Sequence, residues 1–230
     1  MARPSRHLDA ELLNAGEQLY PQWGSAGLSV RRVATAAGVA PGMFHYHFKS
    51  KSDFVGTLLQ RFYDGFFVQL DAQAHAPGEP LERLAHVLAL VARLLRRHGA
   101  MLRRVLADAD AGEPVVLDFV RRNVPRHATL LLGLADEAER AGQLQSMPPL
   151  TRFSFLMGAV VTPVLALSRV QSLGVAPEAL AALIDPQVLS DEAIEQRIAL
   201  ALAALRPPGT LPPQAQKTKT TQVATKRKTS

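Results

Sequence analysis

The chain of 230 residues contains no cysteine. This absence excludes disulfides, thiolate metal sites, thiol nucleophiles and cysteine redox switches, and it suits a reducing compartment such as the cytoplasm. Residues 1–10 include basic side chains, but no apolar run follows them, so they do not form a secretory signal. The longest apolar run, Phe155 to Leu167, contains Pro163 and is too short to span a bilayer, so we expect a buried helix and no membrane partner.

No acidic residue follows Pro207, so this basic tail supplies most of the net positive charge of the chain. The formal net charge is +6 at pH 7, and five of the positive charges lie in this tail, at Lys217, Lys219, Lys226, Arg227 and Lys228. Removing these five leaves +1 for the rest of the chain, so the high net charge says little about the folded part. We predict that residues 207–230 form a disordered basic tail, which is either a solvated extension or an aid to nonspecific phosphate binding.

Catalytic and cofactor motifs are also absent. The sequence has no G-x-S-x-G elbow, no H-E-x-x-H pair, no Walker loop and no dinucleotide fingerprint. His45 and His47 are two residues apart and would point to different sides of a helix, so they do not form a metal site. We therefore expect a protein that is not an enzyme and that needs neither a metal nor a cofactor.

The patterns that are present predict an all-α chain. Apolar residues recur at helical spacing, and no sustained alternation suggests a sheet. Pro21 and Gly24 should end or distort a first helix, Ser29 should cap a second, Pro41 should begin a third and Ser50 should cap a fourth. These signals predict four successive helices between Leu8 and Phe66.

A segment rich in small residues, proline and glycine, residues 73–80, separates residues 1–66 from a second helical region, residues 81–206. Within the second region the prolines at 125 and 163 should kink or open their helices, because each removes one backbone donor. The predicted helices there cover residues 84–98, 101–109, 114–141, 150–173 and 190–205.

The stretch from Leu28 to Lys51, LSVRRVATAAGVAPGMFHYHFKSK, carries the strongest functional signal. Two short helices that cross steeply need apolar contacts, a small residue at closest approach and a glycine in the turn. These requirements are met by Val33, Ala34, Ala37, Gly38, Val39 and Phe44. The spacing predicts a helix-turn-helix.

In such a motif the second helix enters the major groove of DNA, and the flanking groups contact phosphates. Phe44 belongs to the small core. We expect the second helix to face or flank the bases through Pro41, Gly42, Met43, His45, Tyr46 and His47. Phosphate contacts are expected from Ser29, Arg31 and Lys51, since hydroxyls, guanidinium groups and helix N-termini bind phosphate oxygens.

The segment VRRVATAAGVAPGMFHYHFKSKSDF resembles the helix-turn-helix signature of TetR-family regulators, and the resemblance extends over about Leu12 to Phe66. It implies an N-terminal three-helix DNA-binding domain and a helical C-terminal domain that dimerises through its last two long helices and encloses a small-molecule pocket. Two positions depart from the family pattern. Ala40 stands where a capping Ser or Thr is common, and His45 stands where the family usually has a phosphate-contacting tyrosine.

The resemblance leads to a hypothesis for function: a homodimeric repressor that binds a palindromic DNA operator and is released by a small hydrophobic or amphipathic effector. Apolar residues near the predicted kinks, together with a few polar ones, are candidates for lining the effector pocket: Met101, Phe119, His127, Phe153, Met157 and Thr162. Taken alone, each of these residues fits an ordinary core position better than a pocket, since apolar stripes at helical spacing usually just pack. A helical adaptor that keeps the helix-turn-helix shape without binding specific DNA is the alternative function.

Overall fold

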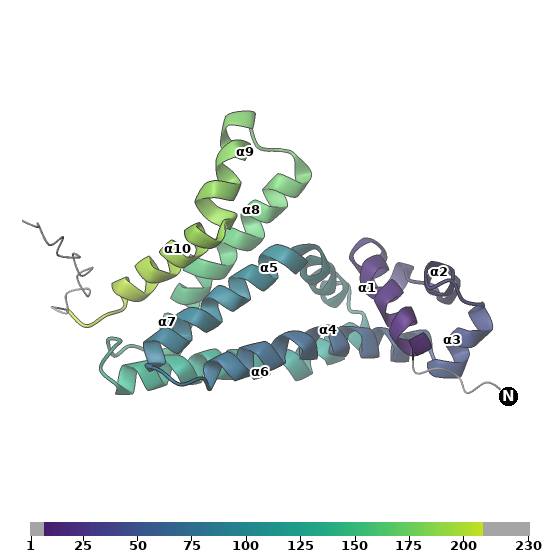
Figure 1. Ribbon diagram of the computed structural model, residues 1–230, viewed down its shortest axis with the longest axis horizontal. Helices are drawn as coiled ribbons and strands as arrows, with labels where there is room; N and C mark the ends of the chain where they lie inside the picture. Colours follow the sequence, from purple (N-terminus) through teal and green to yellow (C-terminus); the bar gives the residue numbers. More distant parts are fainter. Residues whose placement is uncertain (1–6, 209–230) are drawn as a thin grey trace, which may run out of the picture.

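The structure is a computed structural model that describes residues 7–208, and these residues contain helices and no strand. The expected all-α fold is confirmed. The predicted basic tail lies almost entirely outside the described residues. The helices, labelled in Figure 1, are α1 (His7–Gly27), α2 (Val30–Ala36), α3 (Pro41–His47), α4 (Lys51–Ala74), α5 (Pro80–Asp110), α6 (Pro114–Arg140), α7 (Pro149–Leu156), the π-helical turn η1 (Met157–Val161), α8 (Thr162–Leu173), α9 (Glu178–Ile184), the π-helical turn η2 (Asp185–Leu189) and α10 (Asp191–Ala204).

The three N-terminal helices begin and end where local sequence signals place them. Ser29 caps α2, its hydroxyl accepting a hydrogen bond from the Arg32 amide, and Ser50 caps α4 in the same way through the Asp53 amide. Helix α1 is distorted at Gly24, which has a positive φ of 62°. These helices, called the N-terminal unit below, lie together at one end of the molecule (Figure 1).

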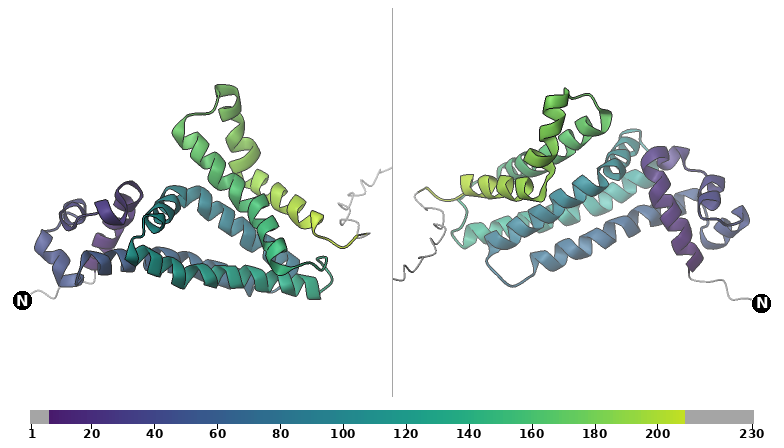
Figure 2. Two further views of the ribbon diagram at one scale, coloured as in Figure 1. Left: turned by 180° about the vertical axis from the view of Figure 1, so that it is seen from behind. Right: turned by 45° about the horizontal axis from the view of Figure 1, so that its top comes forward.

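Helices α4, α5 and α6 carry the fold from the N-terminal unit into the rest of the chain. Helix α4 runs alongside α6, and α5 packs against α1, α4, α6, α8 and α10 (Figures 1 and 2). One core cluster joins α1–α4 to the end of α5 and the start of α6, and a second joins the remaining lengths of α4–α6 to α7–α10. The two ends of α5 therefore belong to different cores.

The predicted breaks in the long helices have three different outcomes. Helix α5 continues through the break expected near residue 98, with only His98 outside helical geometry at φ −114° and ψ 18°. The helix opens before Pro163 into the π-helical turn η1, where the Thr162 amide bonds to the Met157 carbonyl, so this prediction is confirmed. Around Pro125 helix α6 continues without a residue of non-helical geometry.

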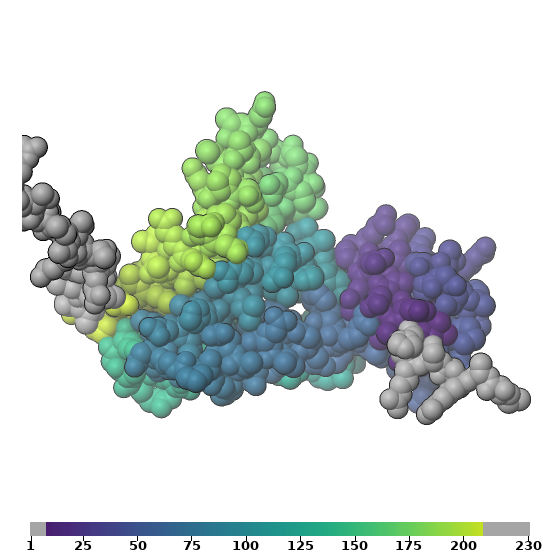
Figure 3. Space-filling model, viewed as in Figure 1, coloured from purple at the N-terminus to yellow at the C-terminus, as the bar shows by residue number. Residues whose placement is uncertain are grey.

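Helix α9 was not expected from the sequence. With the end of α8 it stands out from the body of the molecule (Figures 2 and 3). Its short apolar segment is preceded by Gly174 and Pro177 and gave no periodic pattern long enough to predict a helix.

The expectation that the long apolar helix is buried is wrong for a single chain. By length and composition, Pro149–Leu173 could cross a membrane, yet only 17% of its most apolar window is buried. Leu156, Val160 and Val164 pack against the body, whereas much of the opposite side has no neighbouring helix within residues 7–208. The continuous helix is also longer than the uninterrupted apolar run, because polar residues extend it at both ends.

Candidate DNA-binding surface and effector cavity

A small aromatic core fixes α3 against the helices that support it. The Phe44 ring is fully buried, and its centroid lies 5.1 Å from that of Phe54 and 5.4 Å from that of Phe48. Between α2 and α3, Gly38 adopts a φ of 70°, which an L side chain rarely allows. Phe44 therefore holds one face of α3 inward, and the other face is free.

Four of the six residues expected to meet the bases are exposed on α3. Pro41, Gly42, His45 and Tyr46 are exposed, Tyr46 by 66%, and Met43 and His47 are half-buried. The His47 Nε2 atom is shielded and has no hydrogen-bond partner within residues 7–208. All six expected positions therefore lie on one short helix, and Pro41, Gly42, His45 and Tyr46 are the ones left open to solvent by the described chain.

The three residues expected to contact phosphates differ in whether their side chains already make hydrogen bonds within the protein. Arg31 is exposed. The Ser29 hydroxyl is occupied in capping α2, and the Lys51 ammonium donates to the Ala26 carbonyl over 3.2 Å. Arg32 was not among the expected residues, and its guanidinium lies 3.5 Å from the centroid of the Trp23 ring while donating to the Gly27 carbonyl.

A buried carboxylate joins the N-terminal unit to α5. Asp108, 2% exposed, accepts hydrogen bonds from the Tyr20 hydroxyl and the Ser25 amide, both over 2.7 Å, and pairs with Arg104 over 2.8 Å. Burial, together with the neighbouring Asp108 carboxylate, raises the pKa of Tyr20 far above its ordinary value, so Tyr20 stays a donor at physiological pH. Asp108 thus fixes α1 to the last turns of α5.

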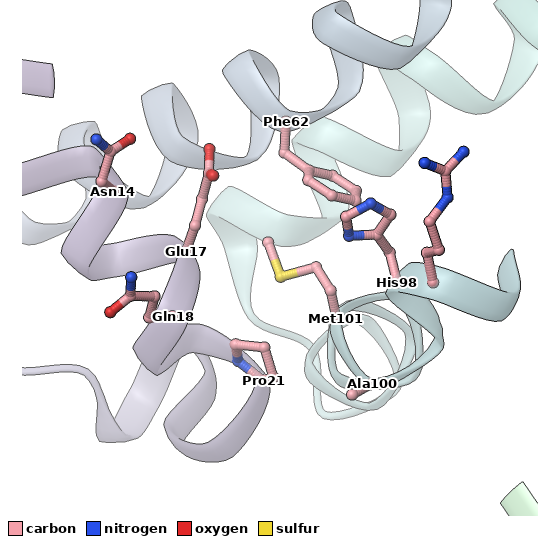
Figure 4. A pocket seen from close by; sticks show the side chains of 9 residues that line it. Asn14, Glu17, Gln18, Pro21, Phe62, His98, Ala100 and Met101 are labelled. Atoms are coloured by element: carbon pink, nitrogen blue, oxygen red, sulfur yellow. The ribbon is translucent and has the colours of Figure 1, made fainter. Parts of the chain in front are cut away.

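Figure 4 shows a recess lined by both polar and apolar side chains, between α1, α4 and the middle of α5 around His98. Glu17 reaches into it from α1 and is held by Arg61 over 2.7 Å. Met101, which was expected to line an effector pocket, faces this recess instead. The ring of His98 lies edge-on to Phe62, at a centroid distance of 5.2 Å.

A second cavity of about 300 Å³ lies among α4, α5, α6 and the α7–α8 helix. Its walls are almost entirely apolar. Of the candidate effector residues, Phe119, His127 and Met157 line it, whereas Met101, Phe153 and Thr162 do not. Phe153 packs beside the second core and Thr162 is exposed.

Several cavity residues escaped the sequence analysis because they come from helices without predicted kinks. Examples are Tyr63 and Phe66 from α4, and Val91, Leu95 and Arg103 from α5. Their helical spacing indicated only that they face the interior of the protein. The position of Arg103 within an apolar stripe was the one feature of the sequence that could have pointed to a cavity there.

Burial sets the protonation of the polar groups in this cavity. It lowers the pKa of His127 below its ordinary value, although a hydrogen bond to the Asn123 carbonyl opposes the shift. It also raises the pKa of Tyr63, whose hydroxyl donates to the same carbonyl over 2.9 Å. At neutral pH both groups are uncharged, so the cavity suits an apolar molecule.

Comparison with known proteins agrees with this geometry. The transcriptional regulator AcrR of Shigella flexneri is 31% identical over 118 residues, covering 49% of this chain and 55% of its own length. The repressor KstR2 of Mycobacterium tuberculosis is 29% identical over 92 residues, covering 40% and 46%. The chain thus spans about half the length of these curated relatives.

The fold as a whole also has solved relatives. A transcriptional regulator from Saccharomonospora viridis, solved in complex with choline, superposes with a TM-score of 0.66 at 17% identity, covering 86% of this chain and 97% of the other. Residues 12–58, which contain the exposed α3, match the model of the tetR family of bacterial regulatory proteins. Together with the helix order and the exposed α3, this match shows that residues 12–58 form a segment of the kind found in the tetR family of bacterial regulatory proteins.

Proposed function

We propose that the protein is a sequence-specific DNA-binding regulator, a repressor that leaves its operator when a small effector binds. The observation that carries the proposal is the division of α3 into a buried side, Phe44, and an exposed side, Tyr46. A helix held from behind in this way can enter a major groove without losing its own packing. The matching family comprises regulatory proteins rather than enzymes, so we propose no catalytic activity. We place the DNA-binding activity in the cytoplasm.

The test of DNA binding is a fluorescence-anisotropy titration of the full chain against the intergenic DNA upstream of its own gene. A scrambled duplex of equal length and composition is the control, and the salt concentration is about physiological so that phosphate-only binding is weakened. We expect a preference of at least about a thousandfold for the operator. Equal affinity for both duplexes would instead favour the helical adaptor.

We further propose that two chains form the functional unit. One side of the Pro149–Leu173 helix exposes small residues four positions apart, and α10 exposes Leu200, which is 66% accessible. Small side chains let two helices approach closely, and an uncovered apolar face is stabilised when a second copy buries it. The exposed small residues are Ser154, Gly158, Thr162 and Ala166.

Light scattering after size exclusion tests the dimer. We expect twice the chain mass at micromolar concentration. A monomer at micromolar concentration would contradict the proposal that two recognition helices, one from each chain, bind the operator together. Without a dimer nothing would fix the spacing between the two helices. Recovery of the protein only with lipid vesicles would assign the exposed face to a membrane instead.

The cavity among α4–α8 is the proposed effector site, with Phe119, His127 and Met157 as contacts. The second half of α5 lines this cavity through Val105 and also carries Asp108, which holds α1. An effector that prefers a shifted α5 would therefore move α1 and the recognition helices with it. Choline in the regulator from Saccharomonospora viridis supports a small molecule as effector in this fold.

A further inference from the structure

Most polar groups around the effector cavity are already satisfied within the protein. The Asn123 amide donates to the Gln60 side chain over 3.0 Å and to the Phe119 carbonyl over 2.9 Å. The Tyr63 hydroxyl donates to the Asn123 carbonyl. A ligand gains little by replacing bonds that the protein already makes.

Arg103 is different. It lines the effector cavity and is only half-buried, and it makes no ion pair or side-chain hydrogen bond within residues 7–208. Its side chain runs back along α5 over the buried Gly99, where an added Cβ would lie 3.0 Å from the Arg103 Nη1 atom. A guanidinium next to an apolar cavity is stabilised by an anionic partner, and Arg103 has none.

The same arginine also lines a neighbouring recess of about 340 Å³ between α5, α8 and η2. Arg96 and Arg97 lie there as well; Arg96 pairs with Asp191 over 2.7 Å, whereas Arg97 has no partner among residues 7–208. The Asp185 carboxylate lines the recess and offsets one of the two free positive charges. The recess therefore keeps an excess of positive charge.

An orphaned donor points to the same place. The Ser168 hydroxyl, contributed by α8 to the recess, is shielded from solvent and has no hydrogen-bond partner in the described part of the chain. A shielded polar atom without a partner is costly and commonly marks a site for a bound group. Ser168 and Arg103 together offer hydrogen-bond donors at the boundary between an apolar and a polar space.

We propose that the effector is an amphipathic anion, with an apolar body in the cavity and a carboxylate or phosphate headgroup on Arg103 in the adjoining recess. This inference rests on the proposed effector function and adds the chemical class of the ligand. A neutral apolar molecule would leave the donors of Arg103 and Ser168 unused. A cationic headgroup would meet two unpaired arginines.

The experiment compares headgroups on one tail. Isothermal titration of the full-length protein uses dodecanoate, dodecyl phosphate, dodecanol and dodecyltrimethylammonium, each below its micellar concentration, together with inorganic phosphate. We expect the two dodecyl anions to bind at least about tenfold more tightly than dodecanol, because hydrogen bonds to charged groups contribute more than neutral ones. The ammonium should bind most weakly, and phosphate alone should bind far more weakly than dodecyl phosphate.

Variants locate the headgroup. Arg103→Gln should weaken the binding of both dodecyl anions roughly 10- to 100-fold and change the affinity for dodecanol by less than about twofold. Asp185→Asn removes the opposing carboxylate and should strengthen anion binding. Arg121→Gln, a change at an exposed arginine of α6, is the matched control and should leave all affinities unchanged. Thermal melting of each variant checks that the fold is intact.

The possible failures are distinguishable. Equal binding of all four dodecyl compounds, or an equal loss of anion and alcohol binding in Arg103→Gln, would overturn the headgroup assignment while leaving the effector cavity in place. Phosphate binding as tightly as dodecyl phosphate would show a free-anion site instead. If no dodecyl compound binds at all, the proposed effector cavity itself fails.

Discussion

Phe44 and Tyr46 are two positions apart on α3, and their surroundings differ completely. Phe44 is fully buried among aromatic rings, whereas Tyr46 is 66% exposed. Residues two apart on a helix point to different sides, so a single short segment can serve both packing and recognition. The sequence predicted this division correctly because the apolar requirements of a helix-turn-helix are strict.

The division of α3 predicts different effects for neighbouring substitutions. Phe44→Ala should destabilise the protein by about 3–5 kcal/mol, because it leaves a cavity in the aromatic core. Tyr46→Ala and His47→Ala should change the free energy of unfolding by less than about 1 kcal/mol while weakening specific DNA binding at least about tenfold. Urea unfolding and anisotropy titrations measure the two properties. Equal destabilisation by all three substitutions would contradict the assigned faces.

His127 makes stability depend on pH. Burial lowers its pKa in the folded protein, so below about pH 6.5 the unfolded chain takes up a proton that the folded chain resists. The contribution of His127 to stability is therefore complete above about pH 6.5 and is lost as the pH falls through the folded pKa. His98, whose pKa is also lowered by burial, should add to the same loss.

The measurement is the urea midpoint of unfolding at pH 8.0 and pH 5.5 for the wild type and for His127→Gln. We expect the midpoint to fall on acidification in both proteins and to fall less in the variant, since the variant lacks the contribution of His127. A larger fall in the variant would mean that protonated His127 is stabilised in the folded state.

At the scale of elements, α3 begins without a side-chain cap. Ala40 occupies the N-cap position with φ −67° and ψ 139° and makes no capping hydrogen bond, whereas Ser29 and Ser50 cap their helices. The missing cap was evident from the sequence, because the family pattern favours Ser or Thr there. Pro41 partly compensates by fixing φ at the first helical position.

Ala40→Ser should stabilise the protein by about 0.5–2 kcal/mol, because its hydroxyl can accept a hydrogen bond from a free amide in the first turn of α3. Thermal and urea unfolding measure the gain. Ala107→Ser, at an exposed position inside α5, is the control and should be neutral or slightly destabilising. A gain of equal size in the control would rule out capping as the cause.

The hydrogen bond between Tyr20 of α1 and Asp108 of α5 leads to a second prediction about the helices. Tyr20→Phe removes the hydrogen bond to Asp108 while preserving the buried ring, and it should cost about 1–3 kcal/mol because a buried charge loses a donor. If Asp108 also transmits the effector signal, the variant should show a smaller change in DNA affinity on effector binding. Anisotropy titrations with and without dodecanoate measure this coupling, and unchanged coupling would limit Asp108 to a structural role.

At the scale of the whole molecule, the exposed face of the Pro149–Leu173 helix predicts how the dimer can be broken. Ala166→Glu places a charge at the C-terminal end of the exposed row of small residues without touching the buried side. We expect a folded monomer by light scattering and circular dichroism, and a loss of operator affinity of at least about a hundredfold, because two half-sites can no longer be bound together. Val68→Glu, which also changes an exposed apolar residue but lies on α4, is the control and should remain dimeric.

The sequence by itself determined the helices of the N-terminal unit, their caps at Ser29 and Ser50, the turn at Gly38 and the buried position of Phe44. These features depend on contacts between residues close in the chain, which local patterns record. It also determined that the helix opens before Pro163, because a missing backbone donor is a local property.

Only the tertiary structure decided which residues surround the effector cavity and which end of α5 meets α1. Arg103, Tyr63 and Asp108 owe their roles to helices that are distant in sequence, and helical periodicity cannot distinguish a cavity wall from a packed core. The structure also decided that the apolar helix from Pro149 to Leu173 leaves one side uncovered. Hydropathy indicates that a surface avoids water, but only the packing of the other helices decides whether the chain itself can cover it.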